Sequence, residues 1–269
     1  MVNDIVSQLD DIYSPSEARE LAFWILEETT GLSRAAILAC KGTQNILNIK
    51  NILERLRKKE PIQYIFGHTQ WFGLDLLVTK DTLIPRPETA ELVELVLRML
   101  PDDRPLRILD IGTGSGCIAI ALKKRCPKWQ VTALDVSEAA LQVARENAAR
   151  NGVEIETIQA DILSDEIGHF DAIVSNPPYV TESEKVSMES NVLDYEPASA
   201  LFVPDDDPLL FYRRIAGLRA APYLFFEINS RFGKTLARFL RDNHYTDVQI
   251  YTDIYDKQRM VTGRIEVES

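Results

Sequence analysis

The chain has few cysteines and no long apolar run, and each absence excludes a class of protein. Its three cysteines (Cys40, Cys117 and Cys126) are too few and too widely spaced for a disulfide framework or a zinc site, so no metal site is predicted. No apolar stretch reaches the roughly 18 residues that a membrane span needs. The polar N-terminus lacks the basic and apolar blocks of a secretory signal. These features predict a cytoplasmic protein.

Basic residues are also scarce. The 30 lysines and arginines against 41 aspartates and glutamates give a net charge of −11. A protein that binds duplex DNA usually has a basic surface, so we do not expect nucleic acid as the main partner. The acidic excess is compatible with a cationic ligand or a basic protein surface. The remaining composition, 45% hydrophobic and 26% charged, is that of a folded protein with one or two domains.

Residues 1–60 predict a small helical domain. Ser14-Pro15-Ser16-Glu17 has the form of a capping box with proline at the first helical position, and the apolar residues that follow share one helical face. A second apolar helical face runs from Ile46 to Leu56 and stops before Pro61. Residues 61–84 change character and predict a β-hairpin that links the helical domain to the rest of the chain.

Residues 85–269 predict a domain of alternating strands and helices. A helix is expected over residues 89–100, and expected strands and helices then alternate from residue 106. This alternation predicts a mostly parallel, doubly wound sheet, with an antiparallel hairpin near 248–251 and 259–265 at one edge. Asp207 is expected to cap a helix over residues 208–219. The polar stretch 181–207 is long for a connection without structure, and such connections are usually functional.

A glycine-rich turn follows the first strand of this domain. The glycines of Asp110-Ile111-Gly112-Thr113-Gly114-Ser115-Gly116 allow a tight turn and a close approach of the backbone to a nucleotide-like ligand. Residues 114–119 also fit the dinucleotide pattern with alanine last. The turn by itself therefore permits either a nicotinamide site or an S-adenosylmethionine site.

Acidic residues at three strand ends favour the adenosylmethionine site. Asp110 precedes the glycines, where a carboxylate can face the ammonium and sulfonium charges of that cofactor. Asp135 ends the second strand, the position from which an acid binds ribose hydroxyls, although a helix cap or a solvated turn is the simpler alternative. Asp161 and Ile162 follow the third strand and can frame an adenine ring, while Asp161 can equally be a loop carboxylate.

The segment Asn176-Pro177-Pro178-Tyr179 ends the fourth strand. Neither proline has a backbone N–H, and each disfavours the helical region for the residue before it. The Asn176 side chain and the Pro177 carbonyl can therefore offer two acceptors to a planar NH2 group, with Tyr179 as a flat wall. This arrangement predicts a substrate that carries a neutral amide or an exocyclic amine. None of the three histidines is assigned a catalytic role.

Five segments together resemble the HemK-type family, whose members methylate the side-chain N5 of glutamine in peptide chain release factors. The similarity spans residues 15–265 and implies a Rossmann-like methyltransferase fold with a small helical N-terminal domain. The segments are Pro61-Ile62-Gln63-Tyr64-Ile65-Phe66-Gly67, Leu83-Ile84-Pro85-Arg86-Pro87-Glu88-Thr89, Asp110–Gly116, Val174-Ser175-Asn176-Pro177-Pro178-Tyr179 and Tyr195-Glu196-Pro197.

The resemblance implies roles for individual residues. The methionine part of adenosylmethionine is expected on Gly112–Gly116 and its ribose on Asp135, while Asn176 to Tyr179 take the glutamine amide. Arg86 and Glu88 are expected at the wall of the site, where an ion pair at a helix start is the alternative reading. The chain departs from the family's pattern at four positions: Ala90, Asn229, Phe232 and Asp256. The departures bear on the C-terminal part of the sheet and leave the expected chemistry unchanged.

Other functions remain open at this stage. A DNA adenine-N6 methyltransferase can use the same four residues on a flipped base, but it needs a basic cleft. A ribosomal protein can replace the release factor as substrate. A non-catalytic adenosylmethionine-binding module and a dehydrogenase have no use for an amide cradle. The helical domain and residues 181–207 are the expected docking surfaces for the protein substrate, and the enzyme is expected to be a monomer.

Overall fold

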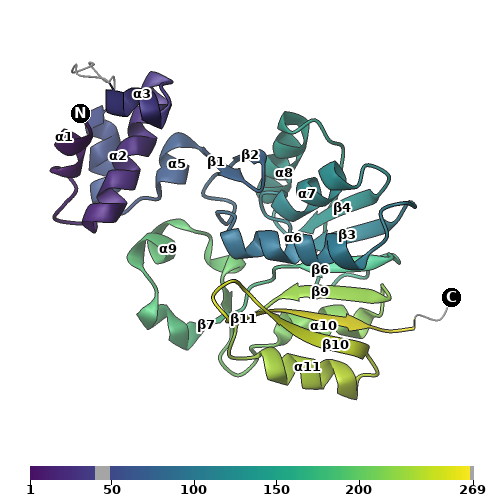
Figure 1. Cartoon of the computed structure of the whole chain (residues 1–269). Coiled ribbons are helices and arrows are strands. Elements are labelled where there is room, and N and C mark those ends of the chain that lie inside the picture. Colours follow the sequence, from purple (N-terminus) through teal and green to yellow (C-terminus); the bar gives the residue numbers. More distant parts are fainter. Residues whose placement is uncertain (40–48, 267–269) are drawn as a thin grey trace. The chain divides into compact units, whose positions relative to one another are not determined.

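The computed structural model describes residues 1–39 and 49–266, and the chain divides into two compact units, Met1–Gly67 and His68–Ser269 (Figure 1). Cys40 and Ile46 lie outside the described residues. In the described part of the chain, no helix is long and apolar enough to cross a membrane.

The first unit is helical, as predicted. Ser14 Oγ accepts the Glu17 amide hydrogen at 3.3 Å, and Pro15 begins the longest helix of this unit. That helix ends at Gly31, which takes the left-handed conformation with φ of 68°. Its apolar face packs with residues of the neighbouring helices into one core. The helices are α1 (Val2–Val6), α2 (Pro15–Thr30), α3 (Arg34–Ala39), α4 (Ile49–Arg57) and α5 (Ile62–Phe66).

The predicted β-hairpin occupies only part of residues 61–84. Residues 62–66 form the short helix α5 because Ile62 is buried in the helical core and Gly67 ends the turn with φ of 77°. The hairpin itself consists of β1 (His68–Trp71) and β2 (Leu74–Leu77), paired antiparallel. Its two turn residues, Phe72 and Gly73, both have positive φ, as tight two-residue hairpin turns require.

The second unit contains a seven-stranded sheet, which confirms the predicted fold class. Its strand order is β10-β11-β9-β6-β3-β4-β5, and only β11 runs antiparallel to its neighbours. The antiparallel edge hairpin is therefore confirmed. The strands are β3 (Arg107–Ile111), β4 (Gln130–Asp135), β5 (Glu156–Gln159), β6 (Ala172–Ser175), β9 (Tyr223–Glu227), β10 (Thr246–Thr252) and β11 (Gln258–Arg264).

Helices cover both faces of this sheet (Figure 1). Alternate residues of each strand point to opposite faces, so Ile108 and Val174 join one core while Leu109 and Ile173 join the other. Residues of α6 (Pro87–Met99), α7 (Cys117–Arg125) and α8 (Glu138–Arg150) belong to the first core. Residues of α10 (Leu210–Leu218) and α11 (Gly233–Asp242) belong to the second.

The start of α10 differs from the prediction. The helix begins at Leu210, with Leu209 as its cap residue and no side-chain cap. The Asp207 carboxylate pairs with Arg213 instead, and only the Asp207 carbonyl accepts a hydrogen bond, from the Leu210 amide at 3.3 Å. The salt bridge to the first turn of the helix therefore replaces the predicted cap.

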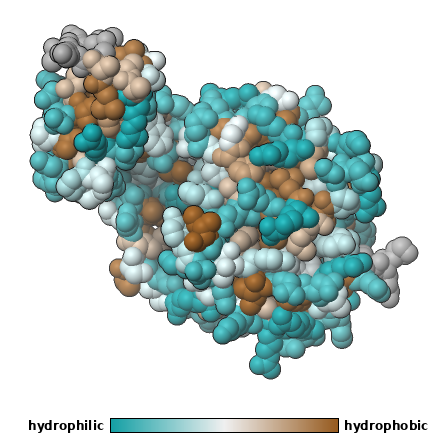
Figure 2. Space-filling view, viewed as in Figure 1, coloured by the Kyte–Doolittle hydropathy of each residue, from teal (hydrophilic) through white to brown (hydrophobic). Residues whose placement is uncertain are grey.

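Residues 180–203 have a structure of their own. They contain β7 (Val180–Thr181), the 3-10 helix η1 (Glu182–Ser187), α9 (Ser190–Tyr195), η2 (Ala198–Ala200) and β8 (Phe202–Val203), with β7 and β8 paired in parallel. Val186 of η1 is 95% exposed. On the face drawn in Figure 2, hydrophilic residues cover most of the surface and hydrophobic residues form small separate patches.

Candidate active site

A cavity of about 280 Å³ lies at the carboxyl ends of β3, β4 and β6. The chain runs outward from β3 through β4 to β5 and then returns to β6 on the other side of β3. The crevice at such a reversal of strand order is where open α/β sheets bind ligands. Further lining residues come from the segment that follows the hairpin and from the segment that follows α9: Lys80, Asp81, Thr82, Leu83, Pro85, Arg86, Pro197, Ser199 and Ala200.

The predicted site residues divide into two groups. Four of them do not line the cavity: Asp110, Gly116, Glu88 and Tyr179. The others do: Arg86, Gly112, Thr113, Gly114, Ser115, Asp135, Asp161, Ile162, Asn176, Pro177 and Pro178. The structure thus brings together residues from five separate segments.

The glycine-rich turn between β3 and α7 shapes one wall. Gly112 and Gly114 have φ of 70° and 53°, and a Cβ atom on either would meet nothing within 4 Å. Their missing side chains therefore leave open space at the backbone. Gly116 has φ of 80°, and its Cβ would lie 3.0 Å from the Ala144 Cβ of α8. The third glycine thus serves the packing of two helices, whereas the first two leave room for a ligand.

Asp110 lies beneath this turn rather than in the cavity. Its side chain is fully buried, and Oδ2 accepts hydrogen bonds from Thr113 Oγ1 at 2.6 Å and from the Ala119 amide at 3.2 Å. Among the described residues, Oδ1 has no hydrogen-bond partner. Desolvation by burial raises the pKa of Asp110 to about 7, although the two hydrogen bonds oppose the shift. In this position Asp110 holds the turn against α7.

Asp135 lies at the end of β4 and lines the cavity. Oδ2 accepts the Gly114 amide hydrogen at 2.9 Å, and Oδ1 accepts the Ser137 amide hydrogen at 2.9 Å. Burial raises its pKa, while these backbone hydrogen bonds favour the charged form. The carboxylate therefore ties the glycine-rich turn to the start of α8 and places a hydrogen-bond acceptor at the wall of the cavity.

Asp161 and Ile162 lie on the wall beyond β5. Asp161 Oδ1 accepts the Leu163 amide hydrogen at 2.9 Å, so its carboxylate organises its own turn. Ile162 is 6% exposed and presents an apolar surface to the cavity together with Ala160 and Val136. Ile162 thus lies in the cavity wall, and its contact with an adenine ring stays a prediction.

Asn176 begins the segment that follows β6. Ser175, the last residue of the strand, donates a hydrogen bond from Oγ to the Ile111 carbonyl at 2.7 Å and so fixes this strand end against β3. Asn176, Pro177 and Pro178 then line the cavity. Tyr179 is not among the residues that line it, and its hydroxyl donates to Glu227 Oε1 at 3.1 Å. The flat wall of tyrosine against the substrate therefore stays a prediction.

A hydrogen-bonded chain lies behind Asn176. Its Nδ2 donates to Thr89 Oγ1 at 3.2 Å, and Thr89 Oγ1 donates to Glu227 Oε2 at 2.7 Å. Glu227, at the end of β9, is 1% exposed, and burial raises its pKa against the opposing effect of its hydrogen bonds and of Arg259. Thr89 lines the cavity, whereas Glu227 does not.

Arg86 is paired with Glu196, not with Glu88. Arg86 Nη2 donates to Glu196 Oε1, and Glu196 Oε2 accepts the Ile84 amide hydrogen at 3.1 Å. The Glu196 side chain is 1% exposed, so this ion pair fixes residues 84–86 against the end of α9. Glu88 is exposed. The alternative reading of an Arg86–Glu88 ion pair at the helix start is therefore wrong.

Comparison with known proteins decides the family. A release factor glutamine methyltransferase of Bacteroides thetaiotaomicron is 46% identical over 96% of this chain and 97% of the relative. One of Flavobacterium psychrophilum is 42% identical over 95% of both chains. The chain belongs to the release factor glutamine methyltransferase family.

Two family models match separate parts of the chain, one in each of its two compact units. The PrmC N-terminal domain model matches residues 1–67, and the methyltransferase small domain model matches residues 91–195. The solved structure of a methyltransferase from Pyrococcus furiosus is similar in fold, with a TM-score of 0.53, 18% identity, and coverage of 80% of this chain and 98% of that one.

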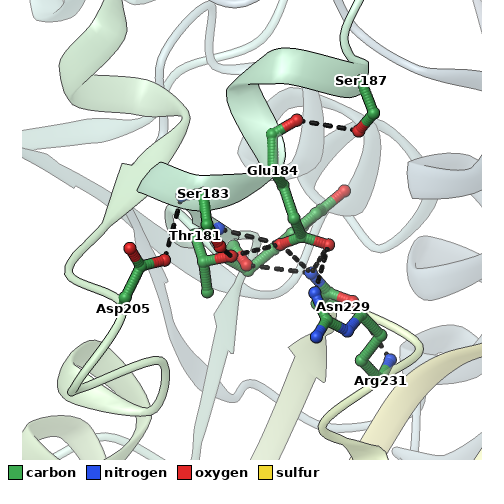
Figure 3. Close-up of polar contacts among 8 residues, drawn as sticks. Thr181, Ser183, Glu184, Ser187, Asp205, Asn229 and Arg231 are labelled. Carbon is green, nitrogen blue, oxygen red and sulfur yellow. Dashed lines mark hydrogen bonds and ion pairs between the residues drawn. The ribbon is translucent and has the colours of Figure 1, made fainter.

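One departure from the family's pattern has a visible structural consequence. Asn229, in place of the usual glycine, donates from Nδ2 to the Tyr179 carbonyl at 3.2 Å and to Glu184 Oε2 at 3.0 Å. Glu184 also accepts the Thr181 hydroxyl hydrogen at 2.8 Å and pairs with Arg231, as Figure 3 shows. This cluster ties the segment after Asn176-Pro177-Pro178 to the loop that follows β9.

Sequence reasoning missed Thr89, Glu196 and Glu227 as functional candidates. Glu227 carries a signal that was available, because it ends an apolar strand in the same way as Asp110 and Asp135. The roles of Thr89 and Glu196 depend on contacts with residues 138 and 112 positions away, which no local pattern reveals.

Proposed function

We propose that this chain transfers a methyl group from S-adenosyl-L-methionine to the side-chain amide nitrogen of a glutamine in peptide chain release factors. The observation that carries the proposal is the position of Asn176, Pro177 and Pro178, which line the same cavity as the glycine-rich turn. Membership of the release factor glutamine methyltransferase family supports the substrate.

The residues of the cavity fit adenosylmethionine. Gly112 and Gly114 leave open space beside their backbone for the methionine part, and Asp135 offers a carboxylate acceptor at the cavity wall for the ribose hydroxyls. Ile162 and Ala160 offer an apolar surface for the adenine ring. Asp110 contributes through the turn that it holds rather than by direct contact. When bound, the cofactor supplies an electrophilic methyl group on a positively charged sulfur.

Asn176 and Pro177 perform the substrate half of the reaction in this proposal. An amide nitrogen is a poor nucleophile because its lone pair is delocalised into the carbonyl group. Asn176 Oδ1 and the Pro177 carbonyl accept the two N–H hydrogens of the glutamine amide and hold its nitrogen in place. Both acceptors gain strength as positive charge develops on the nitrogen, so they favour the transition state. The proton leaves to water.

Two parts of the chain are proposed to dock the release factor. One is the helical unit of residues 1–67, which the PrmC N-terminal domain model matches. The other is residues 181–207, where Val186 is 95% exposed and Leu193 is 37% exposed, so both can be covered by a partner. The net charge of −11 favours a basic protein surface. We also propose that the enzyme acts as a monomer in the cytoplasm, where translation takes place.

The test is transfer of labelled methyl from adenosylmethionine to purified bacterial release factor. Ribosomal proteins and adenine-containing DNA serve as parallel acceptors, because they represent the two competing substrates. The proposal predicts label on the release factor and none on the DNA. Label on DNA or on a ribosomal protein alone would overturn the assigned substrate while leaving the cofactor and the fold in place.

A further inference from the structure

We infer that Thr89 and Glu227 are positioning residues that fix the orientation of the Asn176 amide and thereby select a glutamine over a glutamate. The inference rests on the proposed function, since it concerns the same amide cradle. In this inference, Thr89 and Glu227 act on the reaction only through Asn176 and do not contact the methyl group.

The two residues meet from distant parts of the chain. Thr89 lies in the first turn of α6 and is 2% exposed, and Glu227 ends β9 and is 1% exposed. The 2.7 Å hydrogen bond between them is fully buried, so water does not compete for either group. Tyr179 holds the other carboxylate oxygen of Glu227. Glu227 is therefore fixed on both oxygens.

The Thr89 hydroxyl determines which end of the Asn176 side-chain amide lies against it. A threonine hydroxyl has one hydrogen, and here it is donated to a carboxylate, which in its ionised form can only accept. The Thr89 oxygen can therefore only accept from Asn176. Of the two ends of the Asn176 amide, only the Nδ2 end can donate, and it lies 3.2 Å from Thr89 Oγ1. Asn176 Oδ1 is consequently left for the cavity.

Burial raises the pKa of Glu227, and the charge of Glu88 acts in the same sense. The hydrogen bonds from Thr89 and Tyr179 oppose this shift, as does the charge of Arg259, which pairs with Asp253 at 3.2 Å. These three groups favour the ionised form, which can only accept a hydrogen bond. Arg259 lies on β11, which pairs with β9, and Glu88 lies beside Thr89 on α6, so groups on several elements act on this carboxylate.

The orientation matters because glutamine and glutamate have nearly the same shape. A glutamine amide brings two N–H donors and needs acceptors, whereas a glutamate carboxylate brings only acceptors. With Oδ1 facing the cavity, Asn176 attracts the amide and repels the carboxylate. If Asn176 could rotate, its Nδ2 would face the cavity and would bind the carboxylate. The Thr89–Glu227 pair therefore disfavours the binding of a glutamate in place of the glutamine.

The experiment compares the binding of two peptides to the full-length protein in the presence of S-adenosylhomocysteine, which prevents turnover. The peptides differ only in carrying glutamine or glutamate at the methylated position. The variants are Thr89→Val, which keeps the shape but removes the hydroxyl, and Thr89→Ser, which keeps the hydroxyl. We expect Thr89→Val to reduce the preference for the glutamine peptide by about tenfold, the worth of one hydrogen bond to a charged group. Thr89→Ser should stay within about twofold of wild type.

A purely structural role for Thr89 gives a different result. In that case Thr89→Val weakens both peptides equally and leaves the preference unchanged, which would overturn the inference. Glu227→Gln should give an intermediate preference, because a glutamine there no longer dictates the direction of the Thr89 hydrogen. An unchanged preference in Glu227→Gln would show that Glu227 does not help to orient Asn176. Thermal unfolding of each variant shows whether it is folded, and the Thr89→Ser rescue separates loss of the hydroxyl from loss of packing.

Failure of the proposed function is distinguishable from failure of this inference. If wild-type protein shows no preference for the glutamine peptide, the proposed function fails and the inference fails with it. If wild type prefers glutamine and Thr89→Val retains that full preference, only the inference fails. A turnover measurement adds a second readout, since Thr89→Val should lower kcat on the glutamine peptide, whereas Thr89→Ser should restore it.

Discussion

At the scale of single residues, burial sets the chemistry of Asp110. The carboxyl group is fully buried, one of its oxygens has no partner in the part of the chain that the structure describes, and its pKa is raised from 3.8 to about 7. Between these two values the folded protein keeps a proton that the unfolded chain releases. Since the folded state then binds more protons, its stability falls as the pH rises from about 4 to about 7.

Replacement of Asp110 by Asn tests this effect. Asparagine can still accept the hydrogen bonds of Thr113 and Ala119 through its oxygen, but it does not ionise. We expect the free energy of unfolding of the wild type to fall relative to Asp110→Asn between pH 4 and pH 7, by up to about 4 kcal/mol. Urea unfolding of both proteins across this range measures the difference. Two curves that run parallel with pH would contradict the assignment.

The residue scale also shows what sequence reasoning reached. Asp135, Asn176 and Pro177 were predicted as site residues, and all three line the cavity because the carboxyl ends of parallel strands meet at one edge of the sheet. Asp110 and Tyr179 were also predicted but do not line the cavity, and they bond instead to Thr113 and Glu227. The position of a side chain along a strand therefore predicts the neighbourhood of a residue but not the direction in which it points.

At the scale of elements, the strands and helices of residues 85–269 were predictable because their apolar patterns are strong. Residues 62–66 were not, since their helix depends on the burial of Ile62 in the helical core. The start of α10 was missed because a salt bridge from Asp207 to Arg213 replaced the expected cap. Tertiary contacts therefore account for both errors at this scale.

The contact between the glycine-rich turn and α8 gives a prediction about elements. Gly116→Ala places a Cβ atom 3.0 Å from the Ala144 Cβ at a φ of 80°. We expect it to lower the free energy of unfolding by about 2–4 kcal/mol, the sum of backbone strain and overpacking.

The matched control for this variant is Gly152→Ala. Gly152 also has a positive φ, 69°, but a Cβ there meets nothing within 4 Å. It should cost only the backbone strain, about 1 kcal/mol. Urea unfolding without cofactor measures both variants. Equal losses would show that the packing of α7 against α8 does not require this glycine.

At the scale of the whole molecule, the chain consists of two compact units, Met1–Gly67 and His68–Ser269. Every residue that lines the cavity belongs to the unit of residues 68–269, and that unit has its own two hydrophobic cores. The helical unit has a separate core, and none of its residues 1–39 and 49–67 lines the cavity. The chemistry is therefore expected to reside in the second unit and partner docking to involve the first.

Removal of residues 1–67 tests this division. The shortened protein should methylate a short glutamine peptide within about threefold of the full rate, since its cavity is intact. Methylation of the whole release factor should fall by at least about tenfold, the worth of a single good docking contact. Circular dichroism and thermal unfolding establish that the shortened protein is folded. Equal losses on both substrates would refute a docking role for the helical unit.

The most direct test of the central claim maps the methyl group on the release factor by mass spectrometry, with wild-type enzyme and two variants. Asn176→Ala removes the proposed acceptor, and Asn243→Ala removes an exposed asparagine that does not line the cavity. The account predicts one methyl group on the side-chain amide of one glutamine, with turnover reduced at least ~10²-fold by Asn176→Ala and unchanged by Asn243→Ala. A near-wild-type rate for Asn176→Ala, or methylation of another kind of side chain, would contradict it.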